Sequence, residues 1–257
     1  MKLSTLATAI KKYYLAGLNE TAIWKIDNTA KLLKIGTSTP NQVICAVVEV
    51  PITDEIATTE FGVSDTTKLV KMLGVLNEDV VFSVNEDATT KKVTSIALAS
   101  GDIDMQYVTA DLKVIRDNKM VQVFKGPYPQ FEVEIVVDNE FVENYLTAKS
   151  ALSDSEYVVF QNNPATTKLE MIFGQVHNGN KALNTSKIKI SPKTNDGKST
   201  LALPLSYNAE YLRQILAANT GSESAVLKLS TNTLGYVEYV SEGGIKSTYH
   251  IKGISGK

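Results

Sequence analysis

The chain has 257 residues, which corresponds to one large domain or two smaller ones at roughly 150 residues per domain. Hydrophobic residues make up 43% and charged residues 21%, so a disordered chain is excluded. The single cysteine, Cys45, excludes a disulfide framework, and the net charge of −2 argues against attraction to DNA over the whole surface. No signal peptide or membrane-spanning run is apparent, and we expect a cytoplasmic protein.

Four segments carry the apolar periodicity of amphipathic helices. The first covers about 4–17 and the second about 65–76, while the third begins near Asp138 and the fourth near Asn208. Asp138 and Asn208 are expected to cap their helices, and Ser64 or Asp65 is expected to cap the second. Short runs rich in Val, Ile, Tyr and Phe predict strands at about 43–50, 80–84, 93–99, 131–137, 157–160, 201–205, 225–229 and 236–240.

The predicted helices begin about 61, 73 and 70 residues apart, and strands flank each of them. Each repeat reads as a strand, one helix and then several strands. Four repeats fit an α+β protein of two similar domains, each with two helices packed on antiparallel sheets. We expect one domain over 1–112, a linker over 113–130 that contains two prolines, and a second domain over 131–257.

Several stretches resemble DNA sliding clamps, the polymerase processivity factors, and they occur in the expected order. The opening Met1-Lys-Leu-Ser resembles phage clamps. The other stretches are 77–84 after the second helix, His177-Asn-Gly-Asn, 204–212 before the fourth helix, and 234–239 followed by Tyr249-His-Ile. The whole chain thus resembles the two-domain clamps that assemble as trimers.

This resemblance implies a DNA clamp fold that closes into a homotrimeric ring around duplex DNA. Such a ring tethers the replicative DNA polymerase, has a clamp loader as a further partner, and slides without reading sequence. It implies no enzyme activity, no cofactor and no metal. For a phage protein it implies the host cell cytoplasm.

The resemblance places basic helix residues in the hole of the ring, where they would meet phosphates. On the first two helices, Lys11, Lys12, Lys68 and Lys71 lie off the apolar stripe. In the second half the candidates are Lys149 and Arg213, although Lys149 falls toward the apolar side in an ideal helical count. A solvated helix face is the alternative interpretation of these lysines.

The resemblance also pairs the last strand of one domain with an edge strand of the next subunit. Those strands are expected at about 102–109 and 183–191. Asp102 and Asp104 share one strand face, as do Lys187 and Lys189, so opposite charges are predicted to meet across the subunit interface. The alternative is solvent-facing charge on unrelated strands.

Clamps receive a short hydrophobic peptide of a partner protein under the linker between their domains. The matching apolar positions in this sequence are Val43, Met120, Val121, Val123, Leu234, Ile251 and Ile254. The alternative for the linker positions is a strand that covers the core.

Other functions find little support. His177 and His250 lack a local acid or nucleophile, and the Gly197-Lys-Ser-Thr stretch lacks both the first glycine and the helix of a phosphate-binding loop. A β-rich structural or virion assembly protein with duplicated domains is the main alternative. A single-stranded nucleic-acid binder is disfavoured because basic and aromatic residues are not interleaved.

Overall fold

The structure is a computed structural model and describes all residues except 1, 167, 175–183, 194–200 and 256–257. The chain divides into two compact units. Unit 1 consists of Met1–Phe124 and Glu242–Ser247, and unit 2 of Lys125–Ser241 and Thr248–Lys257. The division after Phe124 falls within the segment 113–130 that the sequence marks as a linker.

Unit 1 contains two antiparallel sheets. One has the strand order β4-β1-β2-β3 and the other the order β5-β6-β7. The strands are β1 (Ala22–Asp27), β2 (Leu32–Ser38), β3 (Ile44–Pro51), β4 (Thr59–Val63), β5 (Val81–Glu86), β6 (Val93–Ser100) and β7 (Ile103–Val108). In the first sheet burial alternates along each strand, as expected when one face covers a core.

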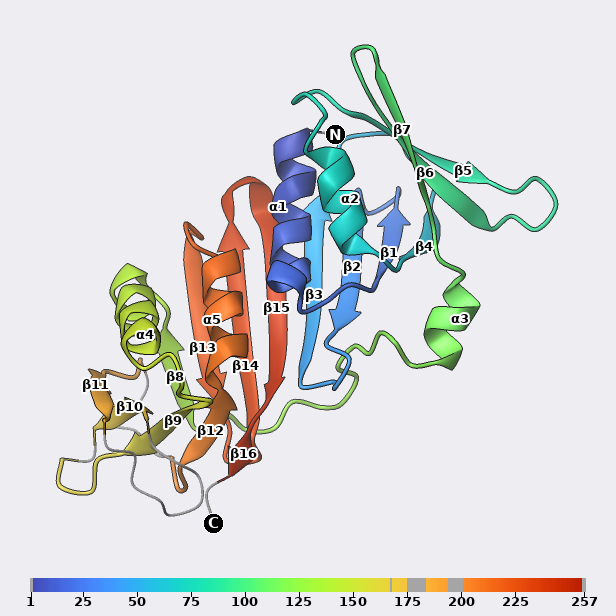
Figure 1. The fold of residues 1–257 in the computed structure, drawn as a ribbon. Helices are drawn as coiled ribbons and strands as arrows, with labels where there is room; N and C mark the ends of the chain where they lie inside the picture. Colours follow the sequence, from blue (N-terminus) through green and yellow to red (C-terminus); the bar gives the residue numbers. More distant parts are fainter. Residues whose placement is uncertain (1, 167, 175–183, 194–200, 256–257) are drawn as a thin grey trace. The chain divides into compact units, whose positions relative to one another are not determined.

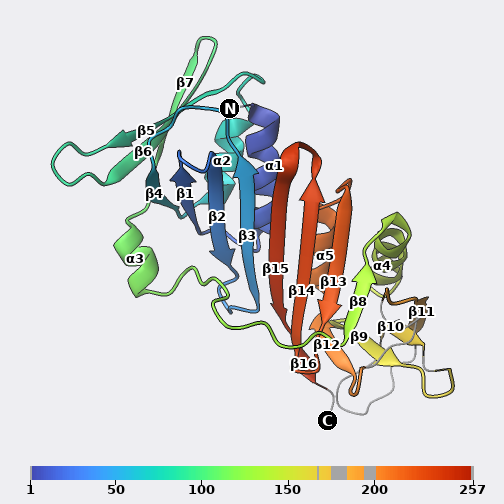
Figure 2. The ribbon, with the colours of Figure 1, turned by 180° about the vertical axis from the view of Figure 1, so that it is seen from behind.

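Helices α1 (Leu3–Tyr14) and α2 (Thr66–Leu73) lie side by side on one face of the first sheet (Figures 1 and 2). They run in opposite directions, because Tyr13 and Tyr14 near the end of α1 bond Thr66 and Thr67 at the start of α2. A short 3-10 turn, η1 (Leu15–Gly17), follows α1. In the core beneath the helices, the fully buried Trp24 packs edge-on against Tyr13 of α1.

A further helix, α3 (Leu112–Asp117), begins at the last residue of the expected first domain and continues into the expected linker. Its six residues are too few to show a helical period in the sequence. Asp111 caps it by accepting a hydrogen bond from the Lys113 amide (2.7 Å), and Ile115 is its buried residue. This helix is not among the four that the sequence predicts.

Unit 2 also contains two antiparallel groups of strands. One has the order β11-β10-β9-β12-β16, and in the other β13 lies between β14 and β8. The strands are β8 (Val133–Val136), β9 (Tyr157–Asn162), β10 (Leu169–Phe173), β11 (Ser186–Ile190), β12 (Leu205–Asn208), β13 (Ser224–Leu229), β14 (Leu234–Ser241), β15 (Ile245–Lys252) and β16 (Ile254–Ser255). The 3-10 turn η3 (Glu242–Gly244) precedes β15, whose first three residues belong to unit 1.

The helices of unit 2 are α4 (Asn139–Ala151) and α5 (Ala209–Ala218), which pack against each other. The buried Tyr145 of α4 donates a hydrogen bond to the Ala209 carbonyl (2.7 Å). The described residues include no helix long and apolar enough to cross a membrane.

The α+β fold with antiparallel sheets is confirmed, and so are the predicted caps. The side chains of Asp65, Asp138 and Asn208 each accept a hydrogen bond from the amide three residues later. The predicted strand at 201–205 is wrong, because β12 begins only at Leu205. Pro204 lacks the N–H that a strand ladder needs at that point.

Candidate functional site

Three exposed lysines lie on the two helices of unit 1. Lys68 and Lys71 are on α2, and Lys11 is on the last turns of α1. Because the helices are antiparallel, Lys11 lies on the part of α1 that is beside the start of α2. Glu20 holds that start in place, since its carboxylate accepts bonds from the Thr67 amide (3.0 Å) and hydroxyl (2.6 Å). The helix pair thus presents a basic outer face.

Lys12 does not belong to this face. Its side chain is 2% exposed, and burial together with the charge of Lys11 lowers the pKa of Lys12 from 10.5 to about 8. The prediction that Lys12 meets DNA is therefore corrected. Burial of its long aliphatic stem beside the core offers the physical reason.

Replacing Lys12 with methionine is expected to change how stability depends on pH. Between pH 8 and 10.5 the unfolded chain binds more protons at Lys12 than the folded chain, so stability rises with pH in the wild type. The shift corresponds to at most about 3 kcal/mol. Lys12→Met removes this rise, because methionine does not titrate. Urea titrations at pH 7, 8, 9 and 10 measure the free energy of unfolding of both proteins. The same dependence of this free energy on pH in the two proteins would contradict the lowered pKa of Lys12.

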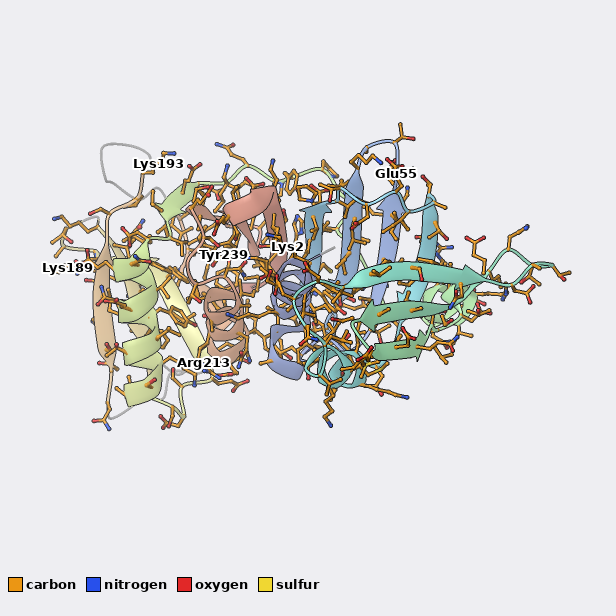
Figure 3. The ribbon with its side chains drawn as sticks, turned by 90° about the horizontal axis from the view of Figure 1, so that it is seen from above. Lys2, Glu55, Lys189, Lys193, Arg213 and Tyr239 are labelled. Atoms are coloured by element: carbon orange, nitrogen blue, oxygen red, sulfur yellow. The ribbon has the colours of Figure 1, made fainter. Side chains whose placement is uncertain are left out.

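The two candidate basic residues on the helices of unit 2, Lys149 and Arg213, are engaged within the protein. Lys149 is 7% exposed, and its ammonium group donates to the carbonyls of Ser153 (2.6 Å) and Ser155 (3.1 Å). Lys149 thus ties the end of α4 to the following loop, and the prediction that it contacts DNA is corrected. Arg213 is partly exposed on α5 (Figure 3) but is paired with Glu210 at 2.5 Å, which lowers the pKa of that carboxyl.

The two strands expected to pair across the subunit interface, β7 and β11, lie at edges of their sheets. Strand β7 pairs only with β6, and β11 pairs only with β10, among the residues that the structure describes. The Thr109 amide donates to the Thr94 carbonyl (3.0 Å), so the alternation of the antiparallel ladder turns the backbone groups of Asp104 toward the open edge. In the other sheet the Asn163 amide donates to the Lys168 carbonyl (2.8 Å), which fixes the alternation in β10 and, through the register of β10 with β11, in β11 as well. The backbone groups of Lys187 and Lys189 therefore face the open edge of β11.

The charges predicted for the subunit interface are mostly on these edges. Asp104 is exposed on β7, and Lys187 and Lys189 are exposed on β11. Figure 3 labels Lys189. Asp102 lies in the turn before β7, so the expectation that it shares a strand face with Asp104 is corrected. Val108, on the open edge of β7, is 74% exposed, which is unusual for a β-branched apolar side chain.

Beside β11 there is a hollow of about 220 Å³ between that strand, β8 and α4. Its lining includes the apolar side chains of Ile135, Phe141, Met171 and Ile188, and Lys189 of β11 is also part of the lining. The hollow could hold an apolar side chain that approaches the edge of β11.

In unit 1 the chain after α3 runs along β2. The Ser38 hydroxyl accepts a bond from the Gln122 amide (3.0 Å), and Val123 lies against Gly36. Residues 120–124 form no strand, so the alternative of a core-covering strand is wrong. Met120 and Val123 are exposed and Val121 is half-buried, while Val43 lies in the turn before β3 rather than on it.

In unit 2 the predicted partner residues differ in exposure. Ile254 is exposed, Leu234 is half-buried, and Ile251 is 1% exposed in the core, so the prediction for Ile251 as a contact is corrected.

An aromatic cluster in this unit was not predicted. Tyr128 is exposed and stacks on His250 with ring centroids 5.6 Å apart. Phe131 and Tyr236 complete the cluster.

Two solved structures of archaeal PCNA match this chain over nearly its full length. PCNA of A. fulgidus, in a structure with the C-terminal region of FEN-1 bound, has a TM-score of 0.73, covering 99% of this chain and 96% of that chain at 14% identity. This chain has the fold of the PCNA sliding clamps. PCNA of Thermococcus kodakaraensis agrees, with a TM-score of 0.69, 12% identity and coverage of 99% and 98%. No protein-family profile and no curated protein matches the sequence.

The described residues contain no group of three His, Cys, Asp or Glu side chains placed to hold a metal ion. What they do contain is a basic helix face, two open strand edges of opposite side-chain charge, and exposed apolar residues on the segment that follows α3.

Proposed function

We propose that this protein is a sliding clamp, a ring that encircles duplex DNA and tethers the replicative DNA polymerase. The observation that carries the proposal is the match to the PCNA fold over 99% of the chain. The chain, as proposed, comprises clamp domains over 1–112 and 131–257 joined by a linker over 113–130. Retention on DNA is topological, so the ring itself makes and breaks no covalent bond.

Three copies form the ring in this proposal, and β7 of one copy pairs with β11 of the next. Both strands have an open edge with backbone donors and acceptors available, which favours strand addition. Asp104 on one edge is opposite in charge to Lys187 and Lys189 on the other. An apolar side chain such as Val108 has a complementary hollow beside β11.

The basic face of α1 and α2 contacts the DNA in the proposed ring. Lys11, Lys68 and Lys71 are exposed point charges, which suits phosphate contact without reading of bases. The helices of unit 2 contribute little positive charge, because Lys149 is buried and Arg213 is paired with Glu210. Contacts are therefore few, as a protein that slides requires.

Partner proteins bind through exposed apolar residues in this proposal. They are Met120 and Val123 in unit 1, and Tyr128 and Ile254 in unit 2. The A. fulgidus PCNA structure holds the C-terminal region of FEN-1, which supports recognition of a short partner segment. The proposed partners are a DNA polymerase and a clamp loader, in the cytoplasm of a host cell if a phage encodes the chain.

Light scattering over a dilution series tests the ring. Three copies of 28.0 kDa give a species of about 84 kDa. That mass at the higher concentrations supports the proposal. A monomer at every accessible concentration would contradict it, because an open subunit cannot retain DNA topologically, and would favour a structural role instead.

Reversing one charge at the proposed interface is expected to weaken the trimer. Asp104→Lys places like charges on the two edges, and Lys189→Asp in the same chain restores an opposite pair. Each cross-strand pair is worth roughly 0.2–1 kcal/mol, so the trimer dissociates at a several-fold higher concentration and recovers in part. Equal dissociation of all three proteins in light scattering would exclude contact between these side chains.

A further inference from the structure

Strand β5 has an open edge of its own. It pairs with β6 on one side, and beyond the bridge between Lys2 and Asp79 no described strand lies on the other. The ladder that turns Asp104 outward fixes β5 as well, because Ser95, Ala97 and Ala99 direct their backbone groups to β5. The backbone groups of Phe82 and Val84 therefore face the open edge. The register shifts at a bulge between Asn85 and Glu86, and beyond it the Asp87 amide donates to the Lys92 carbonyl (2.8 Å), so the backbone groups of Glu86 face the open edge as well.

A groove of about 340 Å³ runs beside this edge. It lies between β5 and the loop that leads into β4, within unit 1. Phe82 and Ile56, both buried, contribute apolar surface, and Val84 and Ala57 lie beside them. An extended segment added to β5 would place alternate side chains on the groove side, since side chains alternate along a strand.

Two carboxylates are among the residues that line the groove. Glu86 is exposed on β5 and accepts a hydrogen bond from the Thr59 hydroxyl (3.3 Å). Glu55 lies on the loop (Figure 3) and is paired with Lys31 at 2.6 Å, an interaction that lowers the pKa of the Glu55 carboxyl. A ligand of this groove would gain from positive charge near Glu86.

We propose that the open edge of β5 and its groove bind an extended segment of a partner protein by strand addition. The segment has apolar side chains at alternate positions, which enter the groove, and a Lys or Arg next to Glu86. Backbone hydrogen bonds to Phe82, Val84 and Glu86 supply affinity, and the groove supplies specificity. In the proposed ring β7 is occupied by the next subunit, whereas β5, at the other side of the same sheet, stays accessible.

A six-residue fluorescent peptide of alternating valine and lysine, matched in length to β5, is the probe. Fluorescence polarisation with the full chain is expected to show saturable binding. Two further peptides carry N-methyl groups, one on the valine nitrogens and the other on the lysine nitrogens. Because only every second residue of an added strand donates its N–H to β5, one of these two peptides loses the hydrogen bonds of the strand pairing. Weaker binding of a methylated peptide by about tenfold or more supports the proposal, and equal binding of all forms would overturn it.

Glu86→Lys is expected to weaken binding of the probe about tenfold, whereas the control Glu242→Lys, exposed on η3 of the same unit, leaves it unchanged. Val84→Pro removes an outward N–H without touching the bonds to β6, and Val84→Thr is its matched control. Hydrogen exchange provides the second readout, since the probe should protect amides of 82–86. If the amides of 82–86 gain no protection, the proposal is overturned. It is also overturned if the rings associate with one another without peptide and this association depends on Glu86, because the edge would then bind a second copy of the chain.

Discussion

Replacing Lys189 with proline is expected to prevent ring assembly while leaving the subunit folded. Lys189 pairs with Glu170 of β10, but the alternation of the ladder turns its own N–H to the open edge of β11. Proline therefore removes a donor to the neighbouring copy and keeps the bonds to β10. An acceptor left without its donor costs about 1–3 kcal/mol at each interface, so dissociation rises about tenfold or more.

The matched control is Lys189→Ala, which removes the charge and keeps the N–H. It should weaken the trimer only slightly, because an exposed ion pair contributes little. Light scattering gives the mass, and circular dichroism shows that β11 and its sheet are retained. A trimer of wild-type affinity in Lys189→Pro would exclude strand addition at β11.

Reversing the three exposed lysines of α1 and α2 is expected to have the largest effect on DNA. Lys11→Glu, Lys68→Glu and Lys71→Glu together replace the basic face with an acidic one. Affinity for a short open duplex at low salt should fall by more than about tenfold. The dependence of log affinity on log salt concentration should flatten by roughly 0.9 for each phosphate that the variant no longer neutralises.

A second triple variant controls for net charge. Lys25, Lys34 and Lys246 are exposed on β1, β2 and β15 of unit 1, and Lys25 follows the buried Trp24, so it lies on the sheet face opposite the helices. Changing these three lysines to Glu shifts the charge equally. Filter binding or polarisation should show a small, long-range loss for this control. An equal loss in both triple variants would show that net charge, and not the helix face, determines binding.

The sequence predicts the local structure well wherever a side chain signals it. Asp65, Asp138 and Asn208 mark three helix starts, because a short polar side chain caps the free amides of the first turn. Helix α3 was missed since six residues give no readable period. The error at 201–205 came from reading apolar residues as a strand despite Pro204, whose missing N–H delays β12.

The candidate site is less predictable, since burial depends on tertiary packing. Lys12 reads as a surface charge, whereas Lys149 falls toward the apolar side in an ideal helical count, and both are buried. The long stem of a lysine can pack inside while its ammonium group donates to carbonyls, as that of Lys149 does. Ile251 was expected at a surface and lies in the core. The edge strands were anticipated from the resemblance, whereas the open edge of β5 follows only from the ladder of hydrogen bonds.

Retention on end-blocked DNA tests the central claim most directly. The protein is incubated with linear duplex that has one blocked end, the second end is then blocked, and the complex is passed through a sizing column at about 0.5 M salt, where direct phosphate contacts are screened. A sliding clamp stays on the doubly blocked DNA and is released when a restriction enzyme cuts it. Protein that leaves the blocked DNA as fast as the open DNA would contradict topological retention, and with it the proposal that this chain is a sliding clamp.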